Sequence, residues 1–388
     1  MTWFGQSNQK MINVVVVDDL PTPYRLALFR DIAELGVINL NVVYLAAKAN
    51  EKQWQLQAEG HGFGVHYLRD IQLYIKSIDT RFQFSWGAGQ ILHRLKPDVI
   101  VVGGYHQIGY WRCLLHCSMH RIPLIVWSGS TLDSEWRPGN WLVRKMKSFF
   151  VRRADRAFAY GTAAKRFLES LGMASENVYK LYNTTDLQVL RRRWLEEQAW
   201  KTHDFEVVKF LFTGRLTPYK GLQKTLSVLS RMSESKFYFR IVGDGHYRNE
   251  AEALVAKLGL GDRVEFVGYV QQEQLAEHLA WADVFVFASV QEVWGIVVNE
   301  ALATGLFVLS STLAGVTEDM IIPEFTGLPI DPLSDEAISQ GLRYCLDNIH
   351  DIRVKRDERS LWSLKFSTQE IRHEFVRGVS CALVRKGK

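Results

Sequence analysis

The chain has 388 residues, of which 47% are hydrophobic and 23% are charged, with 28 Gly and 9 Pro. This composition is close to the globular average, which excludes collagen-like, low-complexity and largely disordered chains, and the length suggests two domains or one large one. Residues 1–190 contain 22 Lys and Arg against 15 Asp and Glu, whereas the remainder has a net charge of −2, and this asymmetry is a clue to the partners of the chain.

The first apolar run, Met11–Val17, is too short to span a bilayer and lacks the basic start and the cleavage site of a signal peptide. Four cysteines in 388 residues do not make a disulfide framework. We therefore expect a soluble protein of a reducing compartment, in the cytoplasm or peripheral on the cytoplasmic face of a membrane.

The first half of the chain alternates short β-branched runs with helical spacings. The predicted elements are, in chain order, a strand at Val14–Val17, a helix at Tyr24–Leu35, and strands at Leu40–Leu45, Asp98–Val102 and Leu124–Trp127. Strands and helices that alternate in this way build a parallel sheet covered on both faces. Residues 1–190 are therefore predicted to form one doubly wound, Rossmann-like α/β domain.

The same alternation restarts after a polar stretch at Leu187–Glu206. The predicted elements are a strand at Val207–Phe212, a helix at Leu222–Met232, and strands at Phe237–Val242, Val264–Val267, Val284–Ala288 and Phe307–Ser310. We predict a linker at 191–206, a second Rossmann-like domain at 207–360, and a C-terminal helix within 361–388 that packs back toward the first domain. Sheets of this kind bind ligands beyond the carboxyl ends of their strands, so the expected site is a cleft between the domains.

A loop between a predicted strand and helix carries two cations in the sequence GRLTPYKG, residues 214–221. Its glycines permit a tight turn, and Arg215 and Lys220 can converge on one anion, the first as a planar fork and the second as a point charge. The sequence matches neither a Walker A loop nor GxGxxG. Two solvated cations on an ordinary loop are the alternative interpretation.

Two glutamates, Glu292 and Glu300, stand eight residues apart in EVWGIVVNEALATG. A helix is expected to begin near Gly295, which leaves the N–H groups of Gly295, Ile296 and Val297 free to bind an anion. Eight helical steps would separate the glutamates by about 12 Å, so they suit two ends of an extended ligand better than one shared proton. The alternative is a solvated loop glutamate and a surface helix glutamate.

Together these segments resemble the retaining nucleotide-sugar glycosyltransferases of family 4, which have the GT-B fold of two doubly wound Rossmann-like domains facing a central cleft. Glu292 and Glu300 match the Glu-x7-Glu signature of that family, and GRLTPYKG matches its phosphate-binding loop. The resemblance is strong over 207–330. Further matching pieces are GDG at 243–245, VEFVGYV at 264–270, LPTPYRLALF at 20–29, GGYH at 103–106 and YNTTD at 182–186.

The resemblance implies roles for individual residues. Arg215 and Lys220 would hold the donor diphosphate and stabilise negative charge as the nucleoside diphosphate departs. Glu292, the third catalytic candidate, would bind hydroxyls of the transferred sugar, and Glu300 would accept hydrogen bonds from the ribose. The other donor-binding candidates are Gly214, Gly243, Val270 beside the base, Gly295, Ile296 and Val297.

We expect the donor diphosphate to bind without a metal ion or other cofactor. Metal-dependent sugar-nucleotide transferases commonly place an Asp-x-Asp pair on the cation, and no two aspartates of this chain are separated by one residue. Arg215, Lys220 and a helix terminus would then stabilise the leaving group in place of Mg²⁺. Retention of configuration is implied by the family alone.

The acceptor side is less well defined, because the family often has a glycine-rich loop after the first strand and residues 18–24 contain no glycine. By loop position the candidates are Tyr105, His106 and Glu135. His106 ranks first because it follows Gly103-Gly104 at a strand end. A structural histidine in a polar loop is the alternative.

The stretch 141–153 mixes cations with Trp and Phe at helical spacing, which suits the surface of an anionic membrane. An amphipathic core helix with a cationic outer face is the alternative. No nucleic-acid-binding motif accompanies these charges, so nucleic acid is not expected as a partner.

The predicted activity is that of a retaining, metal-independent glycosyltransferase. It would move a sugar from a nucleoside-diphosphate sugar to a glycan or lipid-linked acceptor in the synthesis of cell-surface polysaccharide or glycolipid. Two other classes stay open: a sugar-nucleotide epimerase of the GT-B fold, and a non-catalytic glycan-binding relative. The presence of both cations and both glutamates argues against the non-catalytic class.

Overall fold

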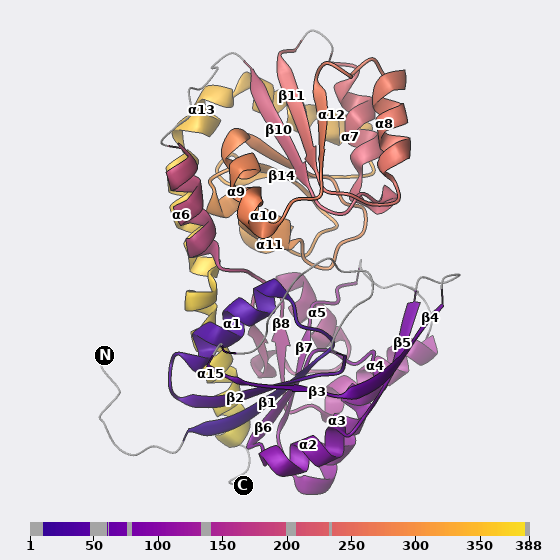
Figure 1. Cartoon of the computed structure of the whole chain (residues 1–388), viewed down its shortest axis with the longest axis vertical. Coiled ribbons are helices and arrows are strands. Elements are labelled where there is room, and N and C mark those ends of the chain that lie inside the picture. The colour runs from indigo at the N-terminus through magenta and orange to yellow at the C-terminus, as the bar shows by residue number, and fades with distance from the viewer. Residues whose placement is uncertain are drawn as a thin grey trace.

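A computed structural model of the chain describes residues 11–46, 60, 62–75, 80–132, 141–198, 207–232 and 235–384. These residues form two α/β domains, stacked one above the other in Figure 1, each built on a parallel sheet with helices on both faces. The prediction of two doubly wound domains is confirmed. Within the described residues, no helix combines the length and the apolar character needed to cross a bilayer.

The sheet of the first domain has seven strands in the order β3-β2-β1-β6-β7-β8-β9, all paired in parallel. Their bounds are β1 Ile12–Asp18, β2 Ile38–Tyr44, β3 Gly64–Tyr67, β6 Val99–Val102, β7 Leu124–Ser128, β8 Arg156–Ala159 and β9 Val178–Lys180. A separate antiparallel hairpin pairs β4 (Arg69–Ile75) with β5 (Thr80–Trp86). The residues of Val14–Val17 are at most 1% exposed, as a strand covered on both faces requires.

Six helices cover the two faces of this sheet: α1 Pro23–Ala33, α2 Ala88–Leu95, α3 Ile108–His120, α4 Trp141–Arg153, α5 Thr162–Ser170 and α15 Thr368–Val384. Helix α15 comes from the C-terminal end of the chain and lies beside α1 in Figure 1. It buries Ile371, Phe375 and Val379 against the sheet, and the ring of Phe375 stacks on Phe158 at 5.2 Å between centroids. The end of the chain thus completes the core of the first domain.

The sheet of the second domain has six parallel strands in the order β12-β11-β10-β13-β14-β15. Their bounds are β10 Val208–Thr213, β11 Phe237–Val242, β12 Val264–Gly268, β13 Val284–Phe287, β14 Phe307–Ser311 and β15 Gly327–Ile330. The helices around it are α7 Leu222–Leu229, α8 Arg248–Lys257, α9 Gln272–Trp281, α10 Ile296–Ala303, α11 Thr317–Met320, α12 Asp335–Asp347, α13 Ile349–Val354 and α14 Arg356–Ser363. Short 3₁₀ turns lie at Ser175–Asn177, Pro218–Lys220 and Leu364–Phe366.

The first half of the expected linker at 191–206, residues 191–198, belongs to helix α6 (Leu187–Gln198). Leu187, Leu190 and Trp194 have helical spacing and are at most 4% exposed, since α6 packs against α9 and α10. The polar residues around them conceal this apolar stripe in the sequence. Residues 199–206 lie outside the described part of the chain.

The two domains meet along the carboxyl edges of their sheets. The N–H and the hydroxyl of Thr162, just after β8, each donate to the carboxylate of Asp319 at 2.7 Å. Arg166 donates to both carboxylate oxygens of Glu318, at 2.5 and 2.6 Å. The loops that follow the strands of both sheets therefore face one another, which is where doubly wound domains bind ligands.

Candidate active site

The strand order of the second sheet reverses between β10 and β13, and the loops that follow these two strands lie against each other. The N–H of Val290 donates to the carbonyl of Tyr219 at 2.8 Å. Gly221 has a φ of +72°, and a Cβ there would collide with the carbonyl oxygen of Ala288, so only glycine permits this approach. The loop 214–221 and the loop 288–295 therefore form one surface at the switch point of the sheet.

Lys220 and Glu292, 72 residues apart in sequence, form an ion pair on this surface. The Lys220 Nζ lies 2.5 Å from the Glu292 Oε2, and their side chains are 24% and 21% exposed. Arg215 lies on the same loop as Lys220 and is exposed. All three catalytic candidates thus lie on loops at the carboxyl edge of the second sheet. The charge of Lys220 is neutralised by Glu292, which the resemblance assigned to the transferred sugar.

The glycine loops named in the sequence are joined by backbone hydrogen bonds. The N–H of Gly214 donates to the carbonyl of Val242 at 3.0 Å, and the N–H of Gly243 donates to the carbonyl of Gly268 at 2.8 Å. Val270 follows in the next loop and is half-buried. The loops after β10, β11 and β12 therefore form a continuous backbone surface beside the Lys220–Glu292 pair.

Helix α10 begins at Ile296, with Gly295 as its N-cap residue, as predicted. The N–H groups at Gly295, Ile296 and Val297 thus open onto the same edge, while Glu300 lies in the second turn. The carboxyl of Glu300 is half-buried, and burial raises its pKa to about 7. Among the described residues, no side chain pairs with this carboxyl, so no neighbouring cation offsets the effect of burial on its pKa.

A buried hydrogen-bond network that the sequence analysis missed fixes α10 to the first domain. The indole N–H of Trp294 donates to the side-chain oxygen of Asn299 at 3.0 Å, and the amide of Asn299 donates to the hydroxyl of Thr184 at 3.2 Å. Asn299 is fully buried. A lone Asn inside the apolar run IVVNEALA was the available signal, because a buried amide needs a partner.

The first sheet has a switch point of its own between β1 and β6, and the acceptor-side candidates lie there. The Nε2 of His106 lies 2.8 Å from the Oδ2 of Asp19, in the loop after β1. Tyr105 is 8% exposed, and its hydroxyl accepts a 3.4 Å hydrogen bond from Ser128. Glu135, the third candidate, lies outside the described residues.

A second acidic residue of this loop, Asp18, is held by a buried cation. The guanidinium of Arg25 lies 3.7 Å from Asp18, donates to the hydroxyl of Tyr160 at 2.7 Å and stacks over the ring of Trp127. Burial raises the pKa of Asp18, although the charge of Arg25 opposes that shift. Neither Asp18 nor Asp19 was named as a candidate, because their partners lie far away in sequence.

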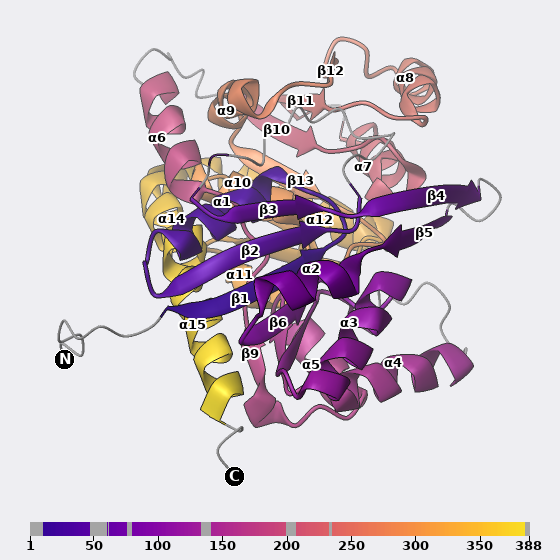
Figure 2. The same cartoon turned by 60° about the horizontal axis from the view of Figure 1, so that its bottom comes forward.

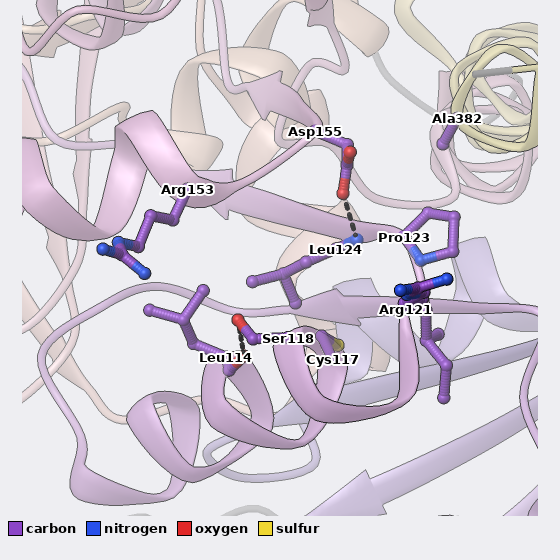
Figure 3. Close-up of a pocket in the computed structure, with 10 residues that line it drawn as sticks. Leu114, Cys117, Ser118, Arg121, Pro123, Leu124, Arg153, Asp155 and Ala382 are labelled. Carbon is purple, nitrogen blue, oxygen red and sulfur yellow. Dashed lines mark hydrogen bonds between the residues drawn. The ribbon is translucent and has the colours of Figure 1, made fainter. Parts of the chain in front are cut away.

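Two cavities of the described structure bear on where a ligand could bind. One cavity, of about 240 Å³, lies between the domains and is lined by Thr131, Arg166, Glu318 and the loop 312–315. This loop also contacts the candidate site, because Ala314 forms a β-bridge with Glu292. Another of about 260 Å³, shown in Figure 3, lies at the opposite edge of the first sheet, where Asp155 accepts from the N–H of Leu124. Only the first adjoins the candidate site. Within the described ranges, no three His, Cys, Asp or Glu side chains are arranged to hold a metal ion.

Two family models match the chain, one for each domain. The model of "Glycosyltransferase Family 4" matches residues 41–189, and the model of "Glycosyl transferases group 1" matches residues 195–359. Among related sequences, the sulfoquinovosyl transferase SQD2 of Arabidopsis thaliana is 29% identical over 305 residues, which are 73% of this chain and 56% of that protein. A GDP-mannose-dependent alpha-mannosyltransferase of Mycobacterium tuberculosis is 33% identical over 186 residues, or 46% of this chain and 44% of that one.

The chain therefore spans about half the length of these relatives. Among solved structures, HepE of Anabaena, determined in complex with UDP, superimposes with a TM-score of 0.75 at 17% identity, over 95% of this chain and 100% of that one. This likeness confirms the GT-B fold. Because these two glycosyltransferase models match the two domains in turn, the chain belongs to the glycosyltransferases of the group 1 and family 4 type.

Proposed function

We propose that this protein transfers a sugar from a nucleoside-diphosphate sugar to a glycan or lipid-linked acceptor, with retention of configuration and without a metal ion. The observation that carries the proposal is the convergence of Arg215, Lys220 and Glu292 with the N-terminus of α10 at the switch point of the second sheet. This edge combines two cations and a row of free N–H groups, which suit a diphosphate, with carboxylates that suit sugar hydroxyls.

The ion pair between Lys220 and Glu292 has a role in this proposal. A donor diphosphate would draw the ammonium of Lys220 away from Glu292, which frees the carboxylate to accept hydrogen bonds from the transferred sugar. Arg215 and Lys220 would then stabilise the charge that develops on the departing nucleoside diphosphate. The cavity of about 240 Å³ beside Glu292 offers space for the acceptor between the domains.

The names of similar proteins support a nucleotide-sugar donor but disagree on its base. HepE was solved with UDP and with UDP-glucose, whereas the mycobacterial relative is described as GDP-mannose-dependent. A panel of UDP-, GDP-, ADP- and dTDP-sugars incubated without acceptor therefore tests the proposal. Slow release of nucleoside diphosphate supports a transferase, conversion to an epimer supports the rival isomerase, and binding without conversion supports a non-catalytic protein. The anomeric configuration of the first product, measured by NMR, tests retention.

We expect removal of divalent metal ions to leave donor turnover unchanged. The physical reason is that Arg215, Lys220 and the terminus of α10 together supply the positive charge that a metal ion would otherwise supply to the diphosphate. The measurement is the release of nucleoside diphosphate before and after treatment with EDTA, and again after Mg²⁺ or Mn²⁺ is restored. A loss of turnover that either ion restores would contradict metal independence.

We also propose that helix α4 rests on an anionic membrane. Trp141, Met146 and Phe149 of this helix are 66%, 51% and 48% exposed, and only Phe150 and Val151 are buried. An amphipathic core helix would bury these residues, so the structure favours the membrane interpretation of the sequence. Figure 2 shows α4 at the edge of the first domain beside α3, which adds exposed apolar side chains at Leu115 and Met119.

Replacing Arg144, Lys145 and Lys147 together with glutamine is expected to weaken binding to anionic vesicles roughly tenfold. Arg144 and Lys145 are exposed, and each contributes about 1 kcal/mol to such binding, whereas Lys147 is half-buried and contributes less. Salt screening reduces the sum. Co-sedimentation with vesicles of phosphatidylcholine and phosphatidylglycerol measures the change. The matched control replaces three exposed lysines on other surfaces, Lys96, Lys257 and Lys355.

Equal losses in the two triple variants would show that net charge alone governs vesicle binding. Unchanged binding after replacement of the α4 cations would exclude this helix as the membrane surface.

A further inference from the structure

Asp19, His106 and Tyr110 form a hydrogen-bonded group across the switch point of the first sheet. The Nε2 of His106 lies 2.8 Å from one carboxylate oxygen of Asp19, and the hydroxyl of Tyr110 donates to the other oxygen at 2.9 Å. A carboxylate can only accept, so Nε2 carries a proton in this arrangement. The pair thus spans the loops after β1 and β6, just as Lys220 and Glu292 span the loops after β10 and β13.

The second ring nitrogen of His106 is left available by the local backbone. Gly104 has a φ of +141°, and a Cβ there would lie 2.9 Å from the Nδ1 of His106, so any other residue would cover this atom. The side chain of His106 is 56% exposed, whereas Tyr110 is fully buried behind it. Asp19 therefore holds the imidazole at Nε2 while more than half of the side chain stays exposed.

The surrounding charges favour the protonated ring. Desolvation lowers the pKa of His106, but the hydrogen bond and the charge of Asp19, together with the charge of Asp18, outweigh it and raise the pKa above its ordinary value. Lys147 of α4 acts in the opposite direction. Tyr110 faces the ring edge-on at 5.6 Å and stays neutral, because burial raises the pKa of its hydroxyl.

An ion pair that merely fastens two loops would be the simpler role, but the loop after β1 is already fixed by its backbone. The N–H of Leu45 donates to the carbonyl of Asp18 at 2.9 Å, and the N–H of Ala46 donates to the carbonyl of Asp19 at 3.1 Å. The Asp19 side chain is therefore not required to place its own loop. A half-exposed ion pair also contributes little to stability.

We propose that Asp19 is a positioning residue that orients His106 as a charged hydrogen-bond donor, whose Nδ1–H contacts an oxygen of the sugar substrate in the cleft. The inference rests on the proposed function and adds a residue that neither the sequence motifs nor the comparisons assign. It follows the arrangement seen at histidines in which a hydrogen bond to one ring nitrogen fixes the tautomer and the direction of the other.

The first test measures the pKa of His106 directly, by NMR titration of the imidazole in the full-length protein. Asp19→Asn preserves the shape of the side chain but removes its charge, and the pKa of His106 is expected to fall by about one pH unit. Tyr110→Phe keeps the charge of the Asp19 carboxylate and should therefore not lower the pKa of His106. The matched control is Asp98→Asn, because Asp98 accepts from the N–H of Asn13 at the opposite edge of the sheet, and its replacement should leave the pKa of His106 unchanged.

The second test follows the pH dependence of donor turnover, with the nucleotide sugar that the panel selects. Activity that needs the imidazolium declines as pH rises through the pKa of His106, so in Asp19→Asn this decline should begin about one pH unit lower. His106→Gln should abolish that part of the profile. Altered NMR titration with an unchanged profile would overturn the proposal, and so would an unchanged NMR titration. Absence of turnover in the parent protein would contradict the proposed function and leave the titration as the test of the Asp19–His106 pair.

Discussion

Arg215→Ala is expected to lower the turnover of the nucleotide-sugar donor about 10²–10³-fold. One preorganised charge that stabilises a developing anion has an effect of this size when it is removed. Arg215 is exposed at the end of β10, whereas its neighbour Lys220 is already paired with Glu292 in the free protein. Arg215 is thus the cation of this loop that can meet the diphosphate first. Steady-state kinetics at saturating donor isolate the effect on turnover from an effect on binding.

The matched control is Arg231→Ala. Arg231 is also exposed, but it pairs with Asp335 at 3.1 Å in another part of the same domain. Its replacement should leave turnover within a few-fold of the parent. Arg215→Lys keeps the charge and loses the planar fork, so it should recover part of the activity. An effect of Arg215→Ala below a few-fold, in a normally folded protein, would remove this residue from the leaving-group site.

The elements predicted from the sequence are those with long apolar runs, such as β1 and β13. The strands that escaped prediction are mostly short strands with a mixed pattern. β9 has three residues, and β15 reads GLPI, in which a glycine and a proline disfavour a strand. Both lie at edges of their sheets, where few backbone pairings and partial burial relax the demand for apolar residues. The local pattern of these two strands is therefore too weak to distinguish them from loops.

The candidate site was likewise predicted only in part from the sequence. Motifs located the loop at 214–221 and both glutamates, but they did not reveal that Lys220 and Glu292 pair, because these residues are 72 positions apart. Asp19 and His106 are separated by 87 positions. Both pairs follow from strand order, since each joins the loops on the two sides of a switch point. Local residue patterns carry little information about which strands become neighbours, and so the pairs became visible only in the structure.

The affinity for the donor is expected to fall about tenfold for each pH unit below 7, because Glu300 has a pKa of about 7 in the free protein. If ribose hydroxyls donate to this carboxyl, the donor binds the ionised form, which is about 1% of the protein at pH 5. Binding at pH 5 should then be about 10²-fold weaker than at pH 9. Calorimetry with an intact nucleotide sugar measures this, because its diphosphate diester does not titrate in the range.

Glu300→Gln supplies the control, since it removes the titration while keeping the size of the side chain. Its affinity should be weak and should lack the tenfold decrease for each pH unit below 7. The same pKa has a second consequence in the absence of donor. A carboxyl whose pKa rises from 4.5 to about 7 on folding binds its proton more tightly in the folded chain, so its contribution to stability is lost as pH rises through that interval. Glu300→Gln should therefore unfold at a higher temperature than the parent at pH 8, and the difference in unfolding temperature should be smaller at pH 4.5. A parent protein whose donor affinity is flat from pH 5 to pH 9 would show that Glu300 does not bind the donor as a carboxylate.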